Sequence, residues 1–491
     1  MSAIIECSSE GIGLQAHRAG NCFRYITSAA EGMTMTTTHN RTVSRRRFVT
    51  AAASTSALAF TIVPRHVLGG AGYTSPGERV NFAGIGAGGQ GGGDVNAIAA
   101  QGANVVALCD VDMQRAAETF KRFPKARVYQ DFRIMLDREE KHIDAVTVGT
   151  PDHIHAVASM NAIRRDKHVY CEKPLTHTIY EARQLTLAAE KHKVATQMGN
   201  QGHATEGARL TNEWIQAGVI GEVREVHVWT DRAGKRWKQG IGRPADTPAI
   251  PNTLAWDLWL GPAPHRPYHS AYVPTYWRGW WDFGTGALGD MGCHIIDHPI
   301  WALNLGSPTS VEAVVTLDGL EVDGQPNFET FPVAAVIYYE FPARGNLPPV
   351  KMTWYEGGLL PSSPAELPAE QRLPESGVLY IGSKGKMYHS AHGGMPQLLP
   401  AQLHEAATTV KKTMARSPGH HTEWLQACQG RGKALSNFSY SGPLTETVLL
   451  GVLAQRLPGR RLEWDANEMK VRNAPELNQF VHKEYRKGWA L

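Results

Sequence analysis

The stretch RVNFAGIGAGGQG, residues 79–91, decides the fold of this 491-residue chain. Residues 79–85 predict an apolar strand, and the glycines that follow predict a tight turn into a helix over 92–101. A second apolar strand over 105–109 ends at Asp110, which lies 19 residues after Gly91. Strand, glycine turn, helix, strand and acid in this order are typical of a dinucleotide-binding unit.

The residue types in this unit fit the chemistry of a dinucleotide. Glycines let the main chain approach a pyrophosphate, and the start of the helix offers unpaired N–H groups to its charge. We therefore assign the turn to cofactor binding, although a glycine turn alone can also be a flexible loop; its residues are Gly86, Gly88, Gly89, Gln90 and Gly91. Asp110 can accept both ribose hydroxyls and would repel a 2′-phosphate, which favours NAD over NADP.

Strands and helices continue to alternate up to residue 198. Strands are expected over 143–149, 168–171 and 194–198, with helices from Asp152 and over 179–193. Thr178 and Glu181 form a capping box at the start of the last helix. Residues 73–199 are therefore expected to form an α/β Rossmann domain, with ligand groups at the carboxyl ends of its strands, where Thr150 and Pro151 stand.

Glu172-Lys173-Pro174, after the glycine fingerprint, resembles the Gfo/Idh/MocA family, which includes glucose-fructose oxidoreductase and inositol 2-dehydrogenase. The resemblance covers residues 79 to about 460 and is weakest in the last third. It implies that Glu172 and Lys173 lie at the nicotinamide, and that Lys173 stabilises alkoxide character on a carbohydrate hydroxyl. It also implies a homodimer or homotetramer. A solvated lysine in a turn is the plainer alternative.

The strict alternation ends after Met198, which indicates a second domain over residues 200–460. A helix over 204–217 precedes strands at 223–230, 311–317, 333–341, 350–354 and 378–381, without crossover helices between them. This pattern predicts an α+β domain with a large open, mainly antiparallel sheet. Residues 461–491 are expected to be a tail that packs on the body. His420 and His421 indicate a solvated helix start.

Residues 256–283 contain nine aromatic residues in 28 positions, against 8% in the whole chain. Rings of this kind stack on the C–H faces of sugars, and Trp277 and Trp281 are the candidates for that role. A loop that builds its own small core, or a subunit contact, explains the rings equally well. Gln201 and His203, after the last Rossmann strand, are further candidates for substrate binding, and His155 for the nicotinamide ribose; a turn and a solvated helix start are their alternatives.

The segment from Gly284 to Asp297 carries the strongest catalytic pattern. Asp290 and His294 are four residues apart and share one face of a helix. Alcohol oxidation requires a base for the hydroxyl proton, and the family resemblance places an Asp and a His at this spacing, so we assign His294 as base, Asp290 as its partner and Asp297 to the substrate. A buried structural histidine is the alternative, as is a metal held by Asp290, His294 and His298; we expect no metal.

Residues 1–72 read as a leader. Arg45-Arg46-Arg47-Phe48 and the mildly apolar run 51–63 resemble a twin-arginine export signal, although a disordered basic tail is possible. The first 75 residues supply the whole formal charge of +4, and the remainder balances 43 basic against 43 acidic residues. The mature chain therefore shows no nucleic-acid surface, and no run is long enough to insert it into a membrane. We expect a periplasmic or otherwise exported protein.

Three functions fit these observations. The first is an NAD-dependent oxidoreductase acting on a secondary hydroxyl of a sugar, polyol or glycoside; export implies that it keeps its cofactor and recycles it in place. The second is a glycosidase or lyase that oxidises transiently, eliminates and reduces again, although the Gly-Gly-His-Gly-Gly segment of such relatives does not occur here. The third is a nucleotide-binding scaffold. Cys109, Cys171, Cys293 and Cys428 lack metal-ligand spacing and are expected to be buried free thiols.

Overall fold

The structure is a computed structural model that describes residues 79–234, 236–322 and 324–491. The predicted leader and twin-arginine signal, residues 1–72, lie outside the described residues. Within the described part of the chain, all four cysteines are free, three of them buried and Cys428 half-buried. Among the helices described, none is both long and apolar enough to cross a bilayer.

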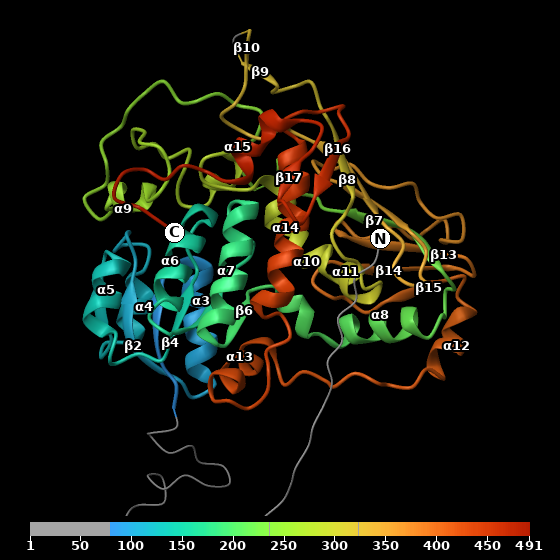
Figure 1. The fold of residues 1–491 in the computed structure, drawn as a ribbon, viewed down its shortest axis with the longest axis horizontal. Helices are drawn as coiled ribbons and strands as arrows, with labels where there is room; N and C mark the ends of the chain where they lie inside the picture. Colours follow the sequence, from blue (N-terminus) through green and yellow to red (C-terminus); the bar gives the residue numbers. More distant parts are fainter. Residues whose placement is uncertain (1–78, 235, 323) are drawn as a thin grey trace, which may run out of the picture. The chain divides into compact units, whose positions relative to one another are not determined.

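The first domain is a parallel six-stranded sheet in the order β3-β2-β1-β4-β5-β6, with helices on both faces (Figure 1). Its strands are β1 (Asn81–Ile85), β2 (Asn104–Cys109), β3 (Arg127–Tyr129), β4 (Ala145–Val148), β5 (His168–Cys171) and β6 (Thr196–Met198). The predicted Rossmann fold is confirmed. The unit β3, α4 (Ala117–Arg122) and α5 (Phe132–Glu139) was not predicted, because β3 is a short strand with a largely exposed pattern.

The helices of this domain begin where local chemistry directs them. The helix after the glycine turn, α3 (Gly89–Ala100), starts three residues earlier than predicted, so the glycines form its first turn. The helix α6 (Asp152–Ile163) follows Pro151, whose fixed φ suits an N-cap. The capping box predicted at Thr178 and Glu181 is present at the start of α7 (Ile179–His192).

The second domain is built on a sheet in the order β15-β14-β13-β7-β12-β11-β8-β16-β17. Its strands are β7 (Val223–Trp229), β8 (Ser310–Val315), β11 (Ala335–Phe341), β12 (Val350–Tyr355), β13 (Gly377–Gly382), β14 (Lys386–Ser390), β15 (Gln397–Leu399), β16 (Leu462–Asp465) and β17 (Lys470–Val471). Only β7 and β12 pair in parallel, so the prediction of a mainly antiparallel sheet is confirmed. A small hairpin of β9 (Glu321–Val322) and β10 (Gln325–Pro326) projects beside it.

Helices from the carboxyl-terminal third tie the two domains together. The helix α14 (Phe438–Ala454) packs between α7 and the strands β8 and β11 (Figure 1). The helix α13 (His420–Cys428) contacts α3, and its Trp424 enters the core beside Phe82. His420 is not at a solvated helix start as expected. It is buried, and its Nε2 lies 2.7 Å from the main-chain oxygen of Met198.

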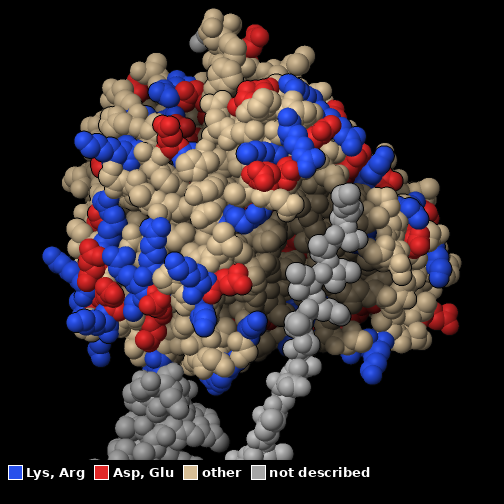
Figure 2. Space-filling view, viewed as in Figure 1, with Lys and Arg blue, Asp and Glu red and all other residues tan. Residues whose placement is uncertain are grey.

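The remaining α-helices lie in the second domain and in the carboxyl-terminal segment. They are α8 (Glu206–Gln216), α9 (Trp256–Leu260), α10 (Gly286–Ile295), α11 (Asp297–Ala302), α12 (Leu403–Thr408) and α15 (Asn478–Val481). The aromatic loop before α10 forms a small core of its own around Trp256, Trp259, Tyr272 and Trp280. Basic and acidic side chains are interspersed over the face drawn in Figure 2, as expected from the balanced charge of residues 76–491.

Candidate active site

A cavity of about 460 Å³ lies where the carboxyl ends of the Rossmann strands meet α10. It collects residues that are far apart in the sequence, as this type of sheet predicts for a ligand site. The predicted site residues that line it are Gly86, Gly88, Gln90, Asp110, Thr150, Pro151, Glu172, Lys173, Gln201, Trp277, Asp290 and His294. One cavity therefore joins the expected nucleotide and catalytic groups.

The glycine turn is closely packed at its base. A Cβ on Gly91 would lie 1.9 Å from the main-chain oxygen of Gly86, and one on Gly86 would lie 2.7 Å from the backbone of Gly149. Gly86 also has a φ of +80°, which other residues rarely adopt. Gly89 and Gly91 shape this turn without lining the cavity. The backbone is thus exposed to a ligand at the start of α3, a cradle that suits a pyrophosphate.

Asp110 closes the same end of the cavity. The main-chain N–H of Gly88 donates to its Oδ2 and that of Asp112 donates to its Oδ1, both at 2.9 Å. Burial raises the pKa of Asp110, and these two N–H groups oppose that effect. Arg115 lies alongside Gly88 and also lines the cavity. The acid is therefore fixed beside the glycine turn, where a ribose hydroxyl can reach its remaining lone pairs.

Lys173 and Asp290 form the centre of the opposite end. The Nζ of Lys173 donates to Oδ1 of Asp290 at 2.9 Å and to its main-chain oxygen at 2.7 Å. Arg278 donates from Nε to the same Oδ1 at 2.9 Å, and Nη1 of Arg232 lies 3.5 Å from Oδ2. Burial alone would raise the pKa of Asp290, but Lys173, Arg278 and Arg232 outweigh it and hold that pKa well below the ordinary value.

This arrangement differs from the expected pair of Asp290 with His294. Among the described residues no hydrogen bond joins the two side chains, because both oxygens of Asp290 face cations. His294 is buried, and its Nδ1 has no hydrogen-bond partner in the described structure. Burial, Lys173 and the nearby His392 lower the pKa of His294 well below the ordinary value. A neutral imidazole, able to accept a proton, is therefore the form present at neutral pH.

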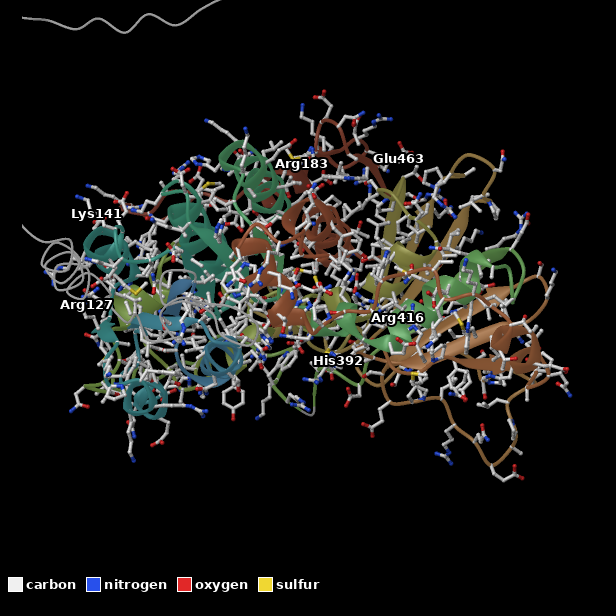
Figure 3. All side chains as sticks on the ribbon, turned by 90° about the horizontal axis from the view of Figure 1, so that it is seen from below. Arg127, Lys141, Arg183, His392, Arg416 and Glu463 are labelled. Atoms are coloured by element: carbon white, nitrogen blue, oxygen red, sulfur yellow. The ribbon has the colours of Figure 1, made fainter. Side chains whose placement is uncertain are left out.

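His392 was not singled out from the sequence, although it lines the cavity. Its ring centroid lies 4.3 Å from that of His294, and its own side chain is exposed to solvent. Figure 3 labels it in the middle of the molecule, between the Rossmann domain and the sheet. Its φ of 60° is unusual for a residue other than glycine. Gly202 packs closely against the loop that presents His392, since a Cβ added at position 202 would lie 2.6 Å from the His392 backbone.

Glu172 and Asp94 are two buried acids that lie close to each other near the glycine turn. Burial and the neighbouring Asp94 raise the pKa of Glu172 to about 8, and burial raises the pKa of Asp94 to about 7. Gln201 donates from Nε2 to Oε1 of Glu172 at 2.9 Å, and Gln90 donates to Oδ1 of Asp94 at 3.2 Å. Near neutral pH the pair therefore retains at least part of a proton.

Besides Gly89 and Gly91, four predicted site residues lie outside the lining of this cavity. His155 is buried beneath it, with ring nitrogens 2.7 and 2.8 Å from the main-chain oxygens of Pro174 and Thr150. His203 and Asp297 are joined by a buried hydrogen bond, with Nδ1 2.9 Å from Oδ2, and pack against Tyr440. Trp281 donates from Nε1 to the main-chain oxygen of Thr330 and lines a different cavity. These residues support the site from behind.

The structure does not assemble the alternative metal site. Asp290 is engaged by cations, and His298 lies outside the cavity with its ring against His389. In the part of the chain that the structure describes, no group of three His, Cys, Asp or Glu residues could hold a metal ion.

Sequence reasoning missed Arg232, Arg278 and Trp489, which also line the cavity. Arg232 and Arg278 come from the insertion of residues 231–283, for which no fold was predicted, and Arg278 lies over the ring of Trp277 at 4.2 Å. Trp489, near the carboxyl terminus, lines the cavity and packs against Phe132. For Arg278, which stands inside the aromatic run, the neighbouring rings were the available signal, since cations frequently stack on such rings.

Two profiles of one oxidoreductase family match the chain in order. Residues 79–200 match its NAD-binding Rossmann fold and residues 206–324 match its C-terminal alpha/beta domain. These matches confirm the predicted NAD-binding domain and the order of the two domains.

Several curated proteins are similar over part of their length. Levoglucosan dehydrogenase of Pseudarthrobacter phenanthrenivorans is 25% identical over 43% of this chain and 44% of its own. The 1,5-anhydro-D-fructose reductase of Ensifer adhaerens is 24% identical over 47% of this chain and 58% of its own. Inositol 2-dehydrogenase of Salmonella typhimurium is 28% identical over 26% and 38%. The chain thus spans about half the length of the curated relatives it matches, or less.

Solved structures share the fold at low identity. The WlbA dehydrogenase of Bordetella pertussis, in complex with NADH and UDP-GlcNAcA, aligns with a TM-score of 0.53 at 17% identity, over 79% of this chain and 99% of that chain. An inositol dehydrogenase homolog of Azotobacter vinelandii, complexed with NADH and myo-inositol, aligns with a TM-score of 0.52 at 17% identity, over 79% and 98%. The combination of Rossmann domain and large sheet is therefore an established architecture.

Proposed function

The chain belongs to the Gfo/Idh/MocA family of oxidoreductases, and from this premise we propose that it oxidises a secondary hydroxyl of a sugar, polyol or glycoside with NAD. One observation carries the proposal: a single cavity joins the glycine turn and Asp110 to Lys173, Asp290 and His294. Nucleotide and reacting hydroxyl would then meet in the same enclosed space.

The residues at the turn fit the nucleotide. The backbone of Gly86 and Gly88 can contact the pyrophosphate, Asp110 the adenosine ribose, and Glu172 the nicotinamide end. When bound, NAD supplies the acceptor for the hydride of the substrate carbon. A carboxylate at Asp110 leaves no favourable place for a 2′-phosphate, which favours NAD over NADP.

Lys173 is placed to hold the substrate oxygen. An ammonium group has three N–H donors, and Asp290 takes two of those of Lys173. The third is left for a ligand in the cavity, where it can stabilise the negative charge that develops on the oxygen. Asp290 is therefore a positioning residue for the lysine, in place of the role beside His294 that its spacing suggested.

His294 is the group for the hydroxyl proton. Its pKa is held well below the ordinary value by burial and by Lys173, so its imidazole is neutral and can accept. Nε2 is the nitrogen that receives the proton, because Nδ1 is fully buried. His392 packs against the same ring and reaches solvent, so the proton can leave through it.

The carbohydrate class of the substrate rests on the lining and on the relatives. Trp277 and Trp259 present rings to the cavity, and Arg232 and Arg278 add hydrogen-bond donors beside them. Rings next to polar donors suit a sugar, whose C–H faces stack while its hydroxyls bond. The names of the similar proteins, which include dehydrogenases of levoglucosan and inositol, support the same class.

We further propose that the protein is exported and keeps its cofactor through each catalytic cycle. The Arg-Arg sequence at residues 45–47 supports export, and the lining of one cavity by residues as far apart as Asp110, Trp277 and Trp489 supports slow release of the nucleotide. Purified protein should carry the absorbance of NAD without added nucleotide. NAD that exchanges fully and binds with a dissociation constant in the millimolar range would overturn the proposal that the cofactor is retained.

We also propose that subunits assemble through the open sheet of the second domain. Tyr338 and Val314 are exposed on neighbouring strands of that sheet, on a face that no helix of the described chain covers there. Exposed apolar residues on adjacent strands are typical of a subunit contact. Light scattering would show a dimer or tetramer, and a monomer would contradict the proposal.

The activity is tested by incubating the protein with NAD and a panel of polyols, free sugars and glycosides. Lasting reduction of nicotinamide by one class supports the proposed function. Aglycone release without net reduction would replace it with transient oxidation and elimination. Lys173→Ala should abolish either reaction, and Lys141→Ala, a surface change in the loop after α5, is the matched control.

A further inference from the structure

A second cavity, of about 360 Å³, lies behind the wall of the first and shares no lining residue with it. It is formed by the start of α7, the end of α14, the segment 281–285 and the carboxyl-terminal segment 479–484. Most of its surface is apolar, with side chains such as Ile179, Leu449 and Leu453. Its volume is in the range of pockets that bind small organic molecules.

Arg456 is the unusual group in this cavity. Its guanidinium carbon lies 3.9 Å from the ring centroid of Trp281 and 4.0 Å from that of Phe480, so aromatic rings cover its faces. Burial lowers its pKa, to about 10, although Asp282 partly opposes the effect. Within the described residues, Arg456 has neither an ion-pair partner nor a hydrogen-bond acceptor. The N–H groups along its edge are therefore the part left to bind a ligand.

The neighbouring charges already have partners. Arg266 forms an ion pair with Asp282, and Glu181 accepts from Tyr485 at 2.8 Å and from Lys483 at 3.1 Å. Glu484 lies at the rim, exposed to solvent. Among the described residues that line this cavity, Arg456 is thus a cation without an ion-pair partner, and it lies beside an apolar surface.

We propose that the second cavity binds a small organic carboxylate of single charge. Its two oxygens would accept from the edge of the Arg456 guanidinium, in the bidentate geometry that this group favours. Its apolar part would lie against Leu449, Leu453 and Ile179. A single unpaired cation matches one carboxylate, whereas a phosphate dianion would bring an uncompensated charge into an apolar pocket.

The bound carboxylate would touch the segment that precedes the catalytic helix. Trp281 and Thr285 line the second cavity, and Oγ1 of Thr285 donates at 2.6 Å to Asp152, which lines the first. The helix α10, with Asp290 and His294, begins directly after Thr285. The two sites are therefore neighbours on opposite sides of one short segment.

This site is tested by calorimetric titration of the protein with benzoate, phenylacetate and hexanoate. Benzamide serves as the uncharged counterpart of benzoate. At least one carboxylate should bind, and benzamide should not. Arg456→Met keeps an apolar stem between the rings and should weaken binding about tenfold or more, because hydrogen bonds to a charged group are lost. Arg456→Lys should recover only part of the affinity.

Arg278→Met is the matched control, since it removes a cation from the first cavity and should leave carboxylate affinity unchanged. Circular dichroism and thermal unfolding establish that each variant is folded. Absence of binding by all three acids, equal affinity in Arg456→Met, or loss of binding in Arg278→Met would each overturn the proposal. A change of oligomeric state in Arg456→Met with unchanged carboxylate affinity would assign the pocket to a subunit contact instead.

Discussion

Lys173 and Asp290, 117 residues apart in the chain, are joined by two hydrogen bonds from one ammonium group, at 2.9 Å to the carboxylate and at 2.7 Å to the main-chain oxygen. The contact fixes a Rossmann loop against a helix of the second domain. Because both bonds go to Asp290, in the middle of α10, the position of the lysine depends on that helix. The role proposed for Lys173 and the packing of the two domains therefore depend on the same contact.

Replacement of Lys173 by Ala should lower kcat by about 100- to 1000-fold, the usual cost of removing a donor to a developing oxyanion. KM should change less, because the donor strengthens most in the transition state. Steady-state kinetics on the substrate found in the panel measure both constants. Wild-type kcat in this variant would contradict the assignment of the lysine.

Replacement of Asp290 by Asn should lower the free energy of unfolding by about 3 kcal/mol, because it leaves buried cations without their counter-charge. The pKa of Asp290 is depressed in the folded protein, so its stabilisation is complete above the ordinary carboxyl pKa. This stabilisation is lost as the pH falls through the lower pKa that Asp290 has in the folded protein.

Urea unfolding of both proteins at several pH values measures this contribution. The difference between wild type and Asp290→Asn should be constant from neutral pH down to about pH 5 and shrink below about pH 4. A difference that grows on acidification would mean that Asp290 is not held as the anion. The comparison isolates one group because all other carboxyls are common to both proteins.

Much of the first domain could be predicted because its signals are local. The glycines, the acid at Asp110 and the capping box at Thr178 each act within a few residues. The catalytic spacing of Asp290 and His294 could also be read, since a helix puts residues four apart on one face. Hydrophobic alternation gave the five central strands of the second sheet, but not the strands at its two edges, β14, β15, β16 and β17.

The partners of the catalytic residues could not be predicted because long-range packing sets them. Asp290 faces Arg232 and Arg278, which come from an irregular insertion without periodicity. His203 and Asp297 looked like substrate ligands, yet each satisfies the other inside the protein. A pattern of residue types indicates possible chemistry, and only the fold decides which polar groups pair with each other.

Replacement of Asp110 by Ala should weaken NAD binding by about tenfold and reduce the preference over NADP. The change removes the acceptor for the ribose and also the partner of the Gly88 N–H. Fluorescence titration of the cofactor-free protein with both nucleotides measures the two affinities. An unchanged ratio of affinities would show that another group makes the distinction.

The acid limb of the pH–rate profile should lie below the ordinary histidine pKa of about 6.5. His294 acts when neutral, and its lowered pKa keeps it neutral as the pH falls, so kcat/KM should hold into moderately acidic buffers. Glu172→Gln is the control, because the pKa of that carboxyl is raised to about 8. An acid limb that disappears in Glu172→Gln would belong to Glu172.

His392 should carry the proton from His294 to solvent. The ring contact of 4.3 Å joins a buried imidazole to an exposed one, and the left-handed backbone that presents His392 is costly enough to suggest a function. His392→Ala should lower kcat by about tenfold or more, with imidazole in the buffer restoring part of the loss. His392→Phe keeps the ring packing but cannot carry a proton, so it should remain slow and unrescued. Wild-type rates in His392→Phe would show that the proton leaves His294 by another route.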